Sequence, residues 1–247
     1  TYPTTFLNKL QIPNHPMHRH TDNKLYFGDV VGNKGVLHYI KTTKTTVEGD
    51  TDDTSAYNAL DFPLGYWPTA IETSGTDLAV ALIEGSNTTI KQKPAKVSFW
   101  DTTATSFSKI TDVEFPDPLI SAMKNINGTL YVFSGNYGGG FRISQYIGGY
   151  TFQEVAFWED GLPPFQGGVD NILNRIVVGS SSTYPATSAC VYALGSKNSK
   201  LSGGLFNILK TTSAGATPMA TAVKYIQSAS FAKPQPIVGW SDGTSSG

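Results

Sequence analysis

Three of the four histidines in this chain of 247 residues lie close together, in the stretch NHPMHRH. Side chains two positions apart on a β-strand point to the same face, so His18 and His20 could together bind zinc or another transition metal. His15 or Asp22 could supply a third ligand. The stretch matches no specific metal-binding motif, however, and the guanidinium of Arg19 would oppose a bound cation. We therefore expect a structural role for these histidines and favour neither a metal site nor a cofactor.

Carboxylates offer a second kind of chemistry. Glycoside hydrolysis requires two of them about 5–10 Å apart across a cleft, which draws attention to Glu72 and Asp170. In the repeat described below, basic residues stand between these two, and this fits charge pairing better than catalysis. The single cysteine, Cys190, lies in the apolar stretch SACVYAL and is expected to be a buried strand thiol. We therefore predict no catalytic residue and no internal disulfide.

The charge balance argues against two classes of partner. The chain has 18 basic and 19 acidic residues, a formal net charge of −1, and only 15% charged residues. A protein that binds nucleic acid or an anionic membrane would carry a basic surplus, so neither partner is expected. No apolar run approaches the roughly 18 residues of a membrane-spanning helix, so we expect no membrane insertion. A surface rich in neutral Thr, Ser, Gly and Asn is typical of virion and extracellular proteins.

The elements that must position these residues follow an internal repeat. Residues 119–158 divide into four short strands separated by Asn-Gly or Gly-rich turns, the punctuation of antiparallel hairpins. Apolar anchors of equivalent second strands recur along the chain at Leu25, Leu78, Leu130, Ile176 and Ile237. Four-stranded units of about 40–50 residues are typical of β-propeller blades. We therefore predict an all-β propeller built from four-stranded antiparallel blades.

The repeat also sets the expected boundaries. We predict a single propeller domain over residues 1–247, with four complete blades, partial blades at both ends and five to seven blades in total. The lone first strand, the four complete blades and the last partial blade are expected at residues 4–12, 15–62, 66–115, 119–158, 166–212 and 218–242. No third strand remains to complete the last blade, so we expect the protein to continue beyond Gly247.

Charged residues recur in the first strands of the blades. Six residues before four of the anchors stand Arg19, Glu72, Lys124 and Asp170, and the strand ATAVK places Lys224 in the same register of the fifth unit, which carries an insertion. Their signs alternate, and we predict a ring of inter-blade ion pairs near one mouth of the propeller channel. Desolvation opposes the Coulomb attraction, so the expected net stabilisation is near zero. In this alignment His18 is equivalent to the apolar residue Ile71.

The blade pattern, NGTLYVFSGN followed by FRISQYIGGYTFQEVAFW, resembles propeller repeats in large virion proteins of tailed phages. The resemblance covers residues 15–242 as a pattern. It implies a rigid module that decorates a collar, tail or fibre. The implied partners are other virion or assembly proteins, or further copies of the same chain, with surface glycans as an additional partner.

These observations favour a non-enzymatic interaction propeller in a virion or an extracellular assembly. Two alternatives stay open: a lectin-like carbohydrate-binding propeller, in which aromatics such as Tyr150 would stack on sugars, and a propeller glycoside hydrolase. Sialidases carry Ser-x-Asp-x-Gly-x-Thr-Trp boxes and an arginine triad. This chain lacks such a box, which argues against a sialidase. The ligand-binding residues stay unknown at this level.

Overall fold

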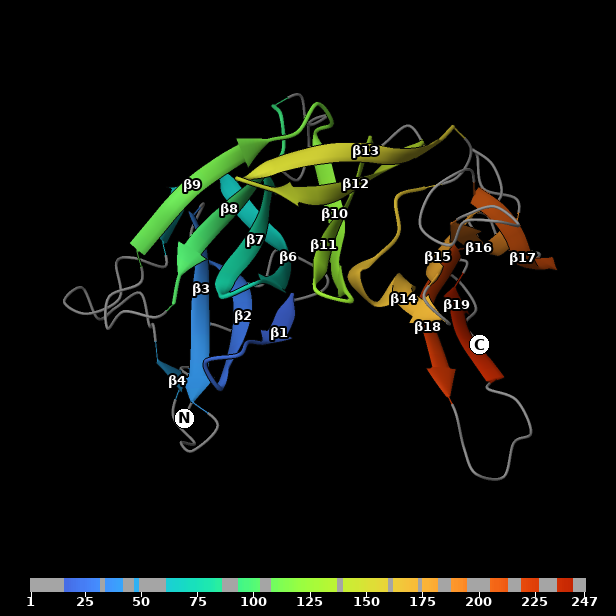
Figure 1. The fold of residues 1–247 in the computed structure, drawn as a ribbon, viewed down its shortest axis with the longest axis horizontal. Coiled ribbons are helices and arrows are strands. Elements are labelled where there is room, and N and C mark those ends of the chain that lie inside the picture. Colours follow the sequence, from blue (N-terminus) through green and yellow to red (C-terminus); the bar gives the residue numbers. More distant parts are fainter. Residues whose placement is uncertain are drawn as a thin grey trace. The chain divides into compact units, whose positions relative to one another are not determined.

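The structure is a computed structural model, and it consists of antiparallel β-sheets (Figure 1). It describes residues 16–31, 34–41, 47–48, 61–85, 93–102, 108–136, 140–159, 162–172, 175–181, 188–194, 205–212, 219–226 and 235–241. The chain divides into two compact units, residues 1–120 and 121–247, which are described separately below. Within the described ranges no helix is long and apolar enough to cross a bilayer.

The first unit contains two sheets. Sheet 1 consists of β1 (Met17–Arg19), β2 (Lys24–Val31), β3 (Lys34–Lys41), β4 (Val47–Glu48) and β5 (Asp61–Leu64). Its strands pair in the order β1-β2-β3-β4, and β5 also pairs with β3. Sheet 2 consists of β6 (Tyr66–Ser74), β7 (Asp77–Glu84), β8 (Lys96–Asp101) and β9 (Ser108–Glu114), paired in chain order.

Sheets 1 and 2 pack face to face through an apolar core. Its buried members are Tyr26, Leu37, Tyr39, Phe62, Ile71, Leu78, Val80, Leu82 and Trp100. The sheets approach closely near β1, where a Cβ added to Gly28 would lie 2.7 Å from Cγ of Pro68. Any larger residue at position 28 would therefore push the two sheets apart. This close approach brings polar side chains of β1 and β6 into contact.

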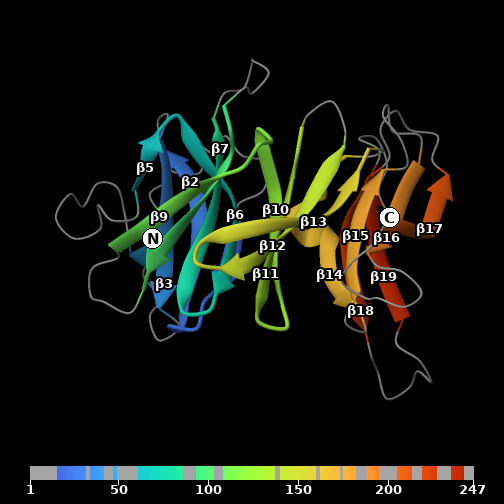
Figure 2. The same ribbon diagram turned by 45° about the horizontal axis from the view of Figure 1, so that its top comes forward.

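The second unit repeats the four-stranded pattern. Sheet 3 consists of β10 (Leu119–Ile126), β11 (Thr129–Gly135), β12 (Phe141–Gly148) and β13 (Thr151–Trp158). After the 3₁₀ turn η2 (Gln166–Gly168), sheet 4 consists of β14 (Val169–Ile172), β15 (Arg175–Ser181), β16 (Ser188–Leu194) and β17 (Leu205–Thr212). The hairpin of β18 (Met219–Ile226) and β19 (Gln235–Ser241) follows, and β18 contacts β15 (Figure 2).

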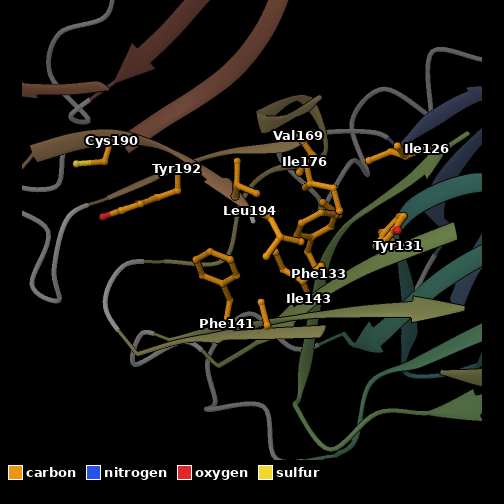
Figure 3. Packing of buried hydrophobic residues seen from close by; sticks show 13 residues of the cluster. Ile126, Tyr131, Phe133, Phe141, Ile143, Val169, Ile176, Cys190, Tyr192 and Leu194 are labelled. Carbon is orange, nitrogen blue, oxygen red and sulfur yellow. The ribbon is translucent and has the colours of Figure 1, made fainter. Parts of the chain in front are cut away.

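A large apolar core joins sheets 3 and 4. Phe133 and Ile143 of sheet 3 point toward Ile176 and Leu194 of sheet 4 (Figure 3). Cys190 is buried in the same core, as its apolar neighbours predicted. The second strands β11 and β15 are buried at nearly every position, and their sequences are accordingly apolar at consecutive positions.

The predicted fold class, four-stranded antiparallel sheets in an all-β chain, is confirmed. The first sheet differs in detail, because β4 and β5 share the outer edge of β3. Two short segments thus occupy an edge that one longer strand occupies in the other sheets. The expected lone strand at residues 4–12 lies outside the described residues. The single domain, the number of blades and the continuation beyond Gly247 stay predictions.

Candidate functional site

A cluster of polar side chains lies where strands β1 and β6 contact each other. Its members come from the β1–β2 hairpin, from β6 and from the end of β8. They are His18, His20, Glu72, Thr73 and Thr102.

His18 bridges two neighbouring residues of β6. Its Nδ1 lies 3.3 Å from Oε1 of Glu72, and its Nε2 lies 2.7 Å from Oγ1 of Thr73. Oε1 of Glu72 also accepts a hydrogen bond from the backbone N–H of Thr73, at 3.0 Å. The side chains of His18 and Glu72 are 19% and 8% exposed, so the pair is largely dry but open to solvent on the histidine side. A carboxylate and an imidazole are both side chains that can act as a general acid or base.

His20 lies deeper, with 2% of its surface exposed. Its Nδ1 is 2.9 Å from Oγ1 of Thr73, and its Nε2 is 3.0 Å from Oγ1 of Thr102 and 3.2 Å from the carbonyl oxygen of Thr76. Burial lowers the pKa of His20 below its ordinary value of 6.5, although the nearby Asp22 carboxylate acts in the opposite direction. His20 is therefore neutral at neutral pH.

The β1–β2 hairpin that carries both histidines is fixed by Asp22. Its carboxylate accepts hydrogen bonds from the Tyr26 hydroxyl at 2.7 Å and from the backbone N–H of Lys24 at 3.1 Å. Burial acts to raise the pKa of Asp22, but these hydrogen bonds and the Lys24 ammonium outweigh it and hold the pKa below 3.8. Burial and the bond to Asp22 raise the pKa of Tyr26 far above its ordinary value of 10. The edge of the His20 ring faces the Tyr26 ring.

The strand register explains why His18, and not Arg19, contacts Glu72. His18 pairs with Tyr26, one residue after the anchor Leu25, and Glu72 pairs with Ala79, one residue after its own anchor. Arg19 pairs with Leu25 itself. A shift of one residue reverses the face to which a side chain points. His18 therefore occupies the position of Glu72 in its sheet, which corrects the alignment of His18 with Ile71.

The members of the predicted charged ring have different surroundings. In the second unit Nζ of Lys224 lies 3.8 Å from Oδ2 of Asp170. Asp170 pairs with Val177, one residue after its anchor, as Glu72 does in sheet 2. Arg19 is exposed on β1, and Lys124 is partly exposed on β10. A complete ring would need both units, so the ring stays a prediction.

The metal hypothesis rested on His15, His18 and His20. Among the residues that the structure describes, no group of three or more His, Cys, Asp or Glu side chains is arranged to hold a metal ion. His15 lies outside the described residues. His18 and His20 share Thr73 as a common hydrogen-bond partner, through Nε2 of one ring and Nδ1 of the other.

Sequence reasoning missed Thr73 and Thr102. Both are hydroxyl partners of the histidines, yet threonine is abundant in this chain and neither residue belongs to a motif. One signal was available, because Thr73 directly follows Glu72 and must point to the opposite face of β6. That face is the one packed on sheet 1, as Leu78, the partner of Thr73 in β7, shows.

Comparison with known proteins identifies the architecture. No protein-family model matches the chain, and no curated protein matches it in sequence. The fold matches the solved structure of a protein named as a 6-phosphogluconolactonase from Bacteroides uniformis, with a TM-score of 0.52, 11% identity, and coverage of 80% of this chain and 54% of that one. The chain spans about half the length of this structure. It spans 56% of the length of the similarly named protein from Bacteroides fragilis.

Two further matches carry sialidase-type names. One is a subtype N10 neuraminidase-like protein of A/little yellow-shouldered bat, with a TM-score of 0.50, 8% identity, and coverage of 86% of this chain and 71% of that one. The other is the Trypanosoma rangeli sialidase in complex with sialic acid, with a TM-score of 0.50, 10% identity, and coverage of 91% and 43%. At such identities the likeness is one of fold, and it establishes that the chain is propeller-like.

The matches correct our functional prediction. We expected a non-enzymatic structural module of the virion type, but the propellers that match carry the names of enzymes, and nothing in them indicates a tailed-phage protein. The prediction gave weight to the absence of known catalytic motifs. Active sites on propellers are assembled from several blades, so a short motif need not mark them.

Proposed function

We propose that the chain is the propeller part of a hydrolase that cleaves an ester or lactone bond of a sugar-derived substrate. The observation that supports this most directly is the pair of His18 and Glu72, 3.3 Å apart on adjacent first strands. In a propeller these strands line the central channel, where a substrate can be bound by several blades. An extracellular location, expected from the low content of charged residues, is part of the proposal.

The pair supplies the two proton transfers that the reaction needs. One member takes a proton from a water molecule while the water oxygen forms a bond to the carbonyl carbon. The bond from that carbon to the leaving oxygen then breaks, and the other member gives the leaving oxygen its proton. A proton transfer between the two side chains restores the pair. The net reaction consumes one water molecule and yields an acid and a free hydroxyl group.

The partner of Glu72 favours an ester or lactone over a glycoside. Most glycoside hydrolases pair a carboxylate with a second carboxylate about 5–10 Å away. Here the nearest ionisable partner recorded for Glu72 is an imidazole. The name lactonase among the structural matches agrees with this chemistry, and the sialidase names agree with a sugar-derived substrate.

A panel assay tests the proposal. The purified protein is incubated with aldonolactones, sugar esters and fluorogenic glycosides, a sialoside among them, and product formation is followed. We expect hydrolysis of the lactones or esters and a loss of at least about 100-fold in kcat/KM for Glu72→Gln, the usual contribution of a general acid or base.

The chain offers a matched control. Asp170 occupies the position in sheet 4 that Glu72 occupies in sheet 2, opposite the residue that follows the anchor. Asp170→Asn removes a carboxylate in the same strand context and should leave kcat/KM within about twofold. Hydrolysis of glycosides alone would contradict the proposal, as would equal activity of wild type and Glu72→Gln.

A further inference from the structure

The hydrogen bonds of the cluster form a chain whose direction is fixed at one end. We infer that His18 is a doubly protonated imidazolium in the resting protein, held in that state by His20 and Thr73, which act as positioning residues. The inference concerns the site of the proposed hydrolase and assigns His18 as its acid and Glu72 as its base. The protonation pattern itself can be measured without any substrate.

The chain of hydrogen bonds starts at the backbone carbonyl of Thr76. A carbonyl oxygen only accepts hydrogen bonds, so Nε2 of His20, 3.2 Å away, must carry a proton. The hydroxyl of Thr102 donates to the same carbonyl at 3.4 Å, which leaves its oxygen free to accept from Nε2 of His20 at 3.0 Å. Because His20 is buried and neutral, its Nδ1 carries no proton. The tautomer of His20 is thereby defined.

The second link is the hydroxyl of Thr73. It lies 2.9 Å from the unprotonated Nδ1 of His20, so it must donate its single proton there. Its oxygen can then only accept from the second histidine. Nε2 of His18, 2.7 Å away, must therefore be protonated and donate to Thr73.

The third link is the contact between His18 and Glu72. A neutral imidazole with its proton on Nε2 would direct a lone pair from Nδ1 at Oε1 of Glu72, only 3.3 Å away. Oε1 already accepts the backbone N–H of Thr73, as a carboxylate oxygen does. The arrangement is favourable when Nδ1 of His18 also carries a proton. His18 is then positively charged and Glu72 negatively charged.

The surrounding charges are compatible with this state. Glu72 of β6 faces His18 directly. Arg19, which follows His18 on β1, is exposed. The electrostatic influences on the adjacent His20 come from Asp22 and Lys24 of the β1–β2 hairpin and from Asp77 of β7. Asp22 and Lys24 form an ion pair with each other at 3.1 Å.

The inference gives each group of the proposed reaction a role. Glu72 is ionised and can take a proton from water, whereas His18 carries the proton that the leaving oxygen requires. Thr73 accepts from His18 without competing for its proton. A threonine that donated to His18 instead would form a nucleophile–base pair, and the direction of the chain excludes that arrangement.

Nitrogen-detected NMR tests the inference directly. Long-range ¹H–¹⁵N correlation spectra of a protein with four histidines resolve the protonation state of each ring, and single His→Gln variants assign the signals. At about pH 7.5, where an ordinary histidine is mostly neutral, we expect both nitrogens of His18 to be protonated and His20 to be neutral with its proton on Nε2. A neutral His18, or a His20 protonated on Nδ1, would overturn the inference.

A pair of variants tests the link through Thr73. Thr73→Ser keeps the hydroxyl and should leave the spectra of both rings unchanged. Thr73→Val removes it, and a larger neutral fraction of His18 is expected at the same pH. An unchanged His18 in Thr73→Val would contradict the role of Thr73, and the spectrum of the wild type decides the rest should this variant not fold. The expected spectra without lactone or ester hydrolysis would refute only the proposed function.

Discussion

Two first strands carry a carboxylate at the same register position, and their surroundings differ sharply. In sheet 2, Glu72 is 8% exposed and contacts His18, whose second nitrogen continues into the hydrogen-bond chain of Thr73 and His20. In sheet 4, Asp170 is 15% exposed and faces Lys224 at 3.8 Å, and the lysine is 66% exposed. One carboxylate is part of a largely dry network, whereas the other belongs to a solvated ion pair.

The difference shows what a repeat fold keeps and what it varies. The backbone places a side chain at the same point of each sheet, so a carboxylate can occupy it in several blades. Its properties then depend on what the next sheet presents. The exposed pair of Asp170 and Lys224 contributes little, because water screens both charges. The pair of His18 and Glu72 lies in a drier setting, where interactions with charge are stronger and hydrogen bonds fix geometry.

The largest expected effect comes from removing the buried histidine. His20→Ala removes one hydrogen-bond partner each from the Thr76 carbonyl and from the hydroxyls of Thr73 and Thr102, and it opens a small cavity. We expect a loss of about 2–4 kcal/mol in the free energy of unfolding. Urea unfolding monitored by tryptophan fluorescence measures it. A loss below about 1 kcal/mol would show that the cluster contributes no more to the free energy of unfolding than the solvated pair does.

The second expected effect is a pH dependence of stability that comes from His20. The pKa of His20 is lowered by folding, so the unfolded chain binds the proton more tightly than the folded one below about pH 6.5. Stability should therefore fall as the pH is lowered through 6.5 toward the folded pKa, and the contribution is fully present above that range. The free energy of unfolding, measured between pH 8 and 5, should fall less in His20→Gln than in the wild type. Parallel curves for the two proteins would contradict this role of His20.

The smallest expected effect concerns the solvated pair. Lys224→Ala should change the free energy of unfolding by less than about 0.5 kcal/mol, because an exposed ion pair at this distance is weak. The same unfolding measurement, made at low and at high salt, checks this. A loss larger than about 1 kcal/mol would place the two carboxylates in the same class and remove the contrast between the sheets.

The architecture could be predicted from the sequence because its signals are local. Turns such as that at Asn127 and Gly128, which adopt φ values of 53° and 86°, mark the hairpins, and apolar anchors mark the central strands. The outer edge of sheet 1 could not be predicted. Two short segments, β4 and β5, pair there with different stretches of β3, and propensity does not decide between tertiary partners.

The candidate site was predictable in its residues but not in its contacts. The sequence drew attention to His18, His20 and Glu72, but as separate features. Their contact depends on the strand register, which the length of the hairpin sets. The anchor pair of Thr73 and Leu78 encloses the four residues 74–77, whereas the anchor pair of Arg19 and Leu25 encloses the five residues 20–24. An alignment at equal distance from the anchors is wrong by one residue for β1, and one residue reverses the face of the strand.

The pH dependence of kcat/KM for the hydrolysed lactone or ester decides whether His18 and Glu72 are the acid and base. A bell-shaped profile is expected for the wild type, because Glu72 must be ionised and His18 must be protonated. Glu72→Gln should lose the acidic limb along with most of the activity, and His18→Asn should lose the alkaline limb. Profiles that keep both limbs in both variants would contradict the assignment of this pair as the acid and base of the reaction.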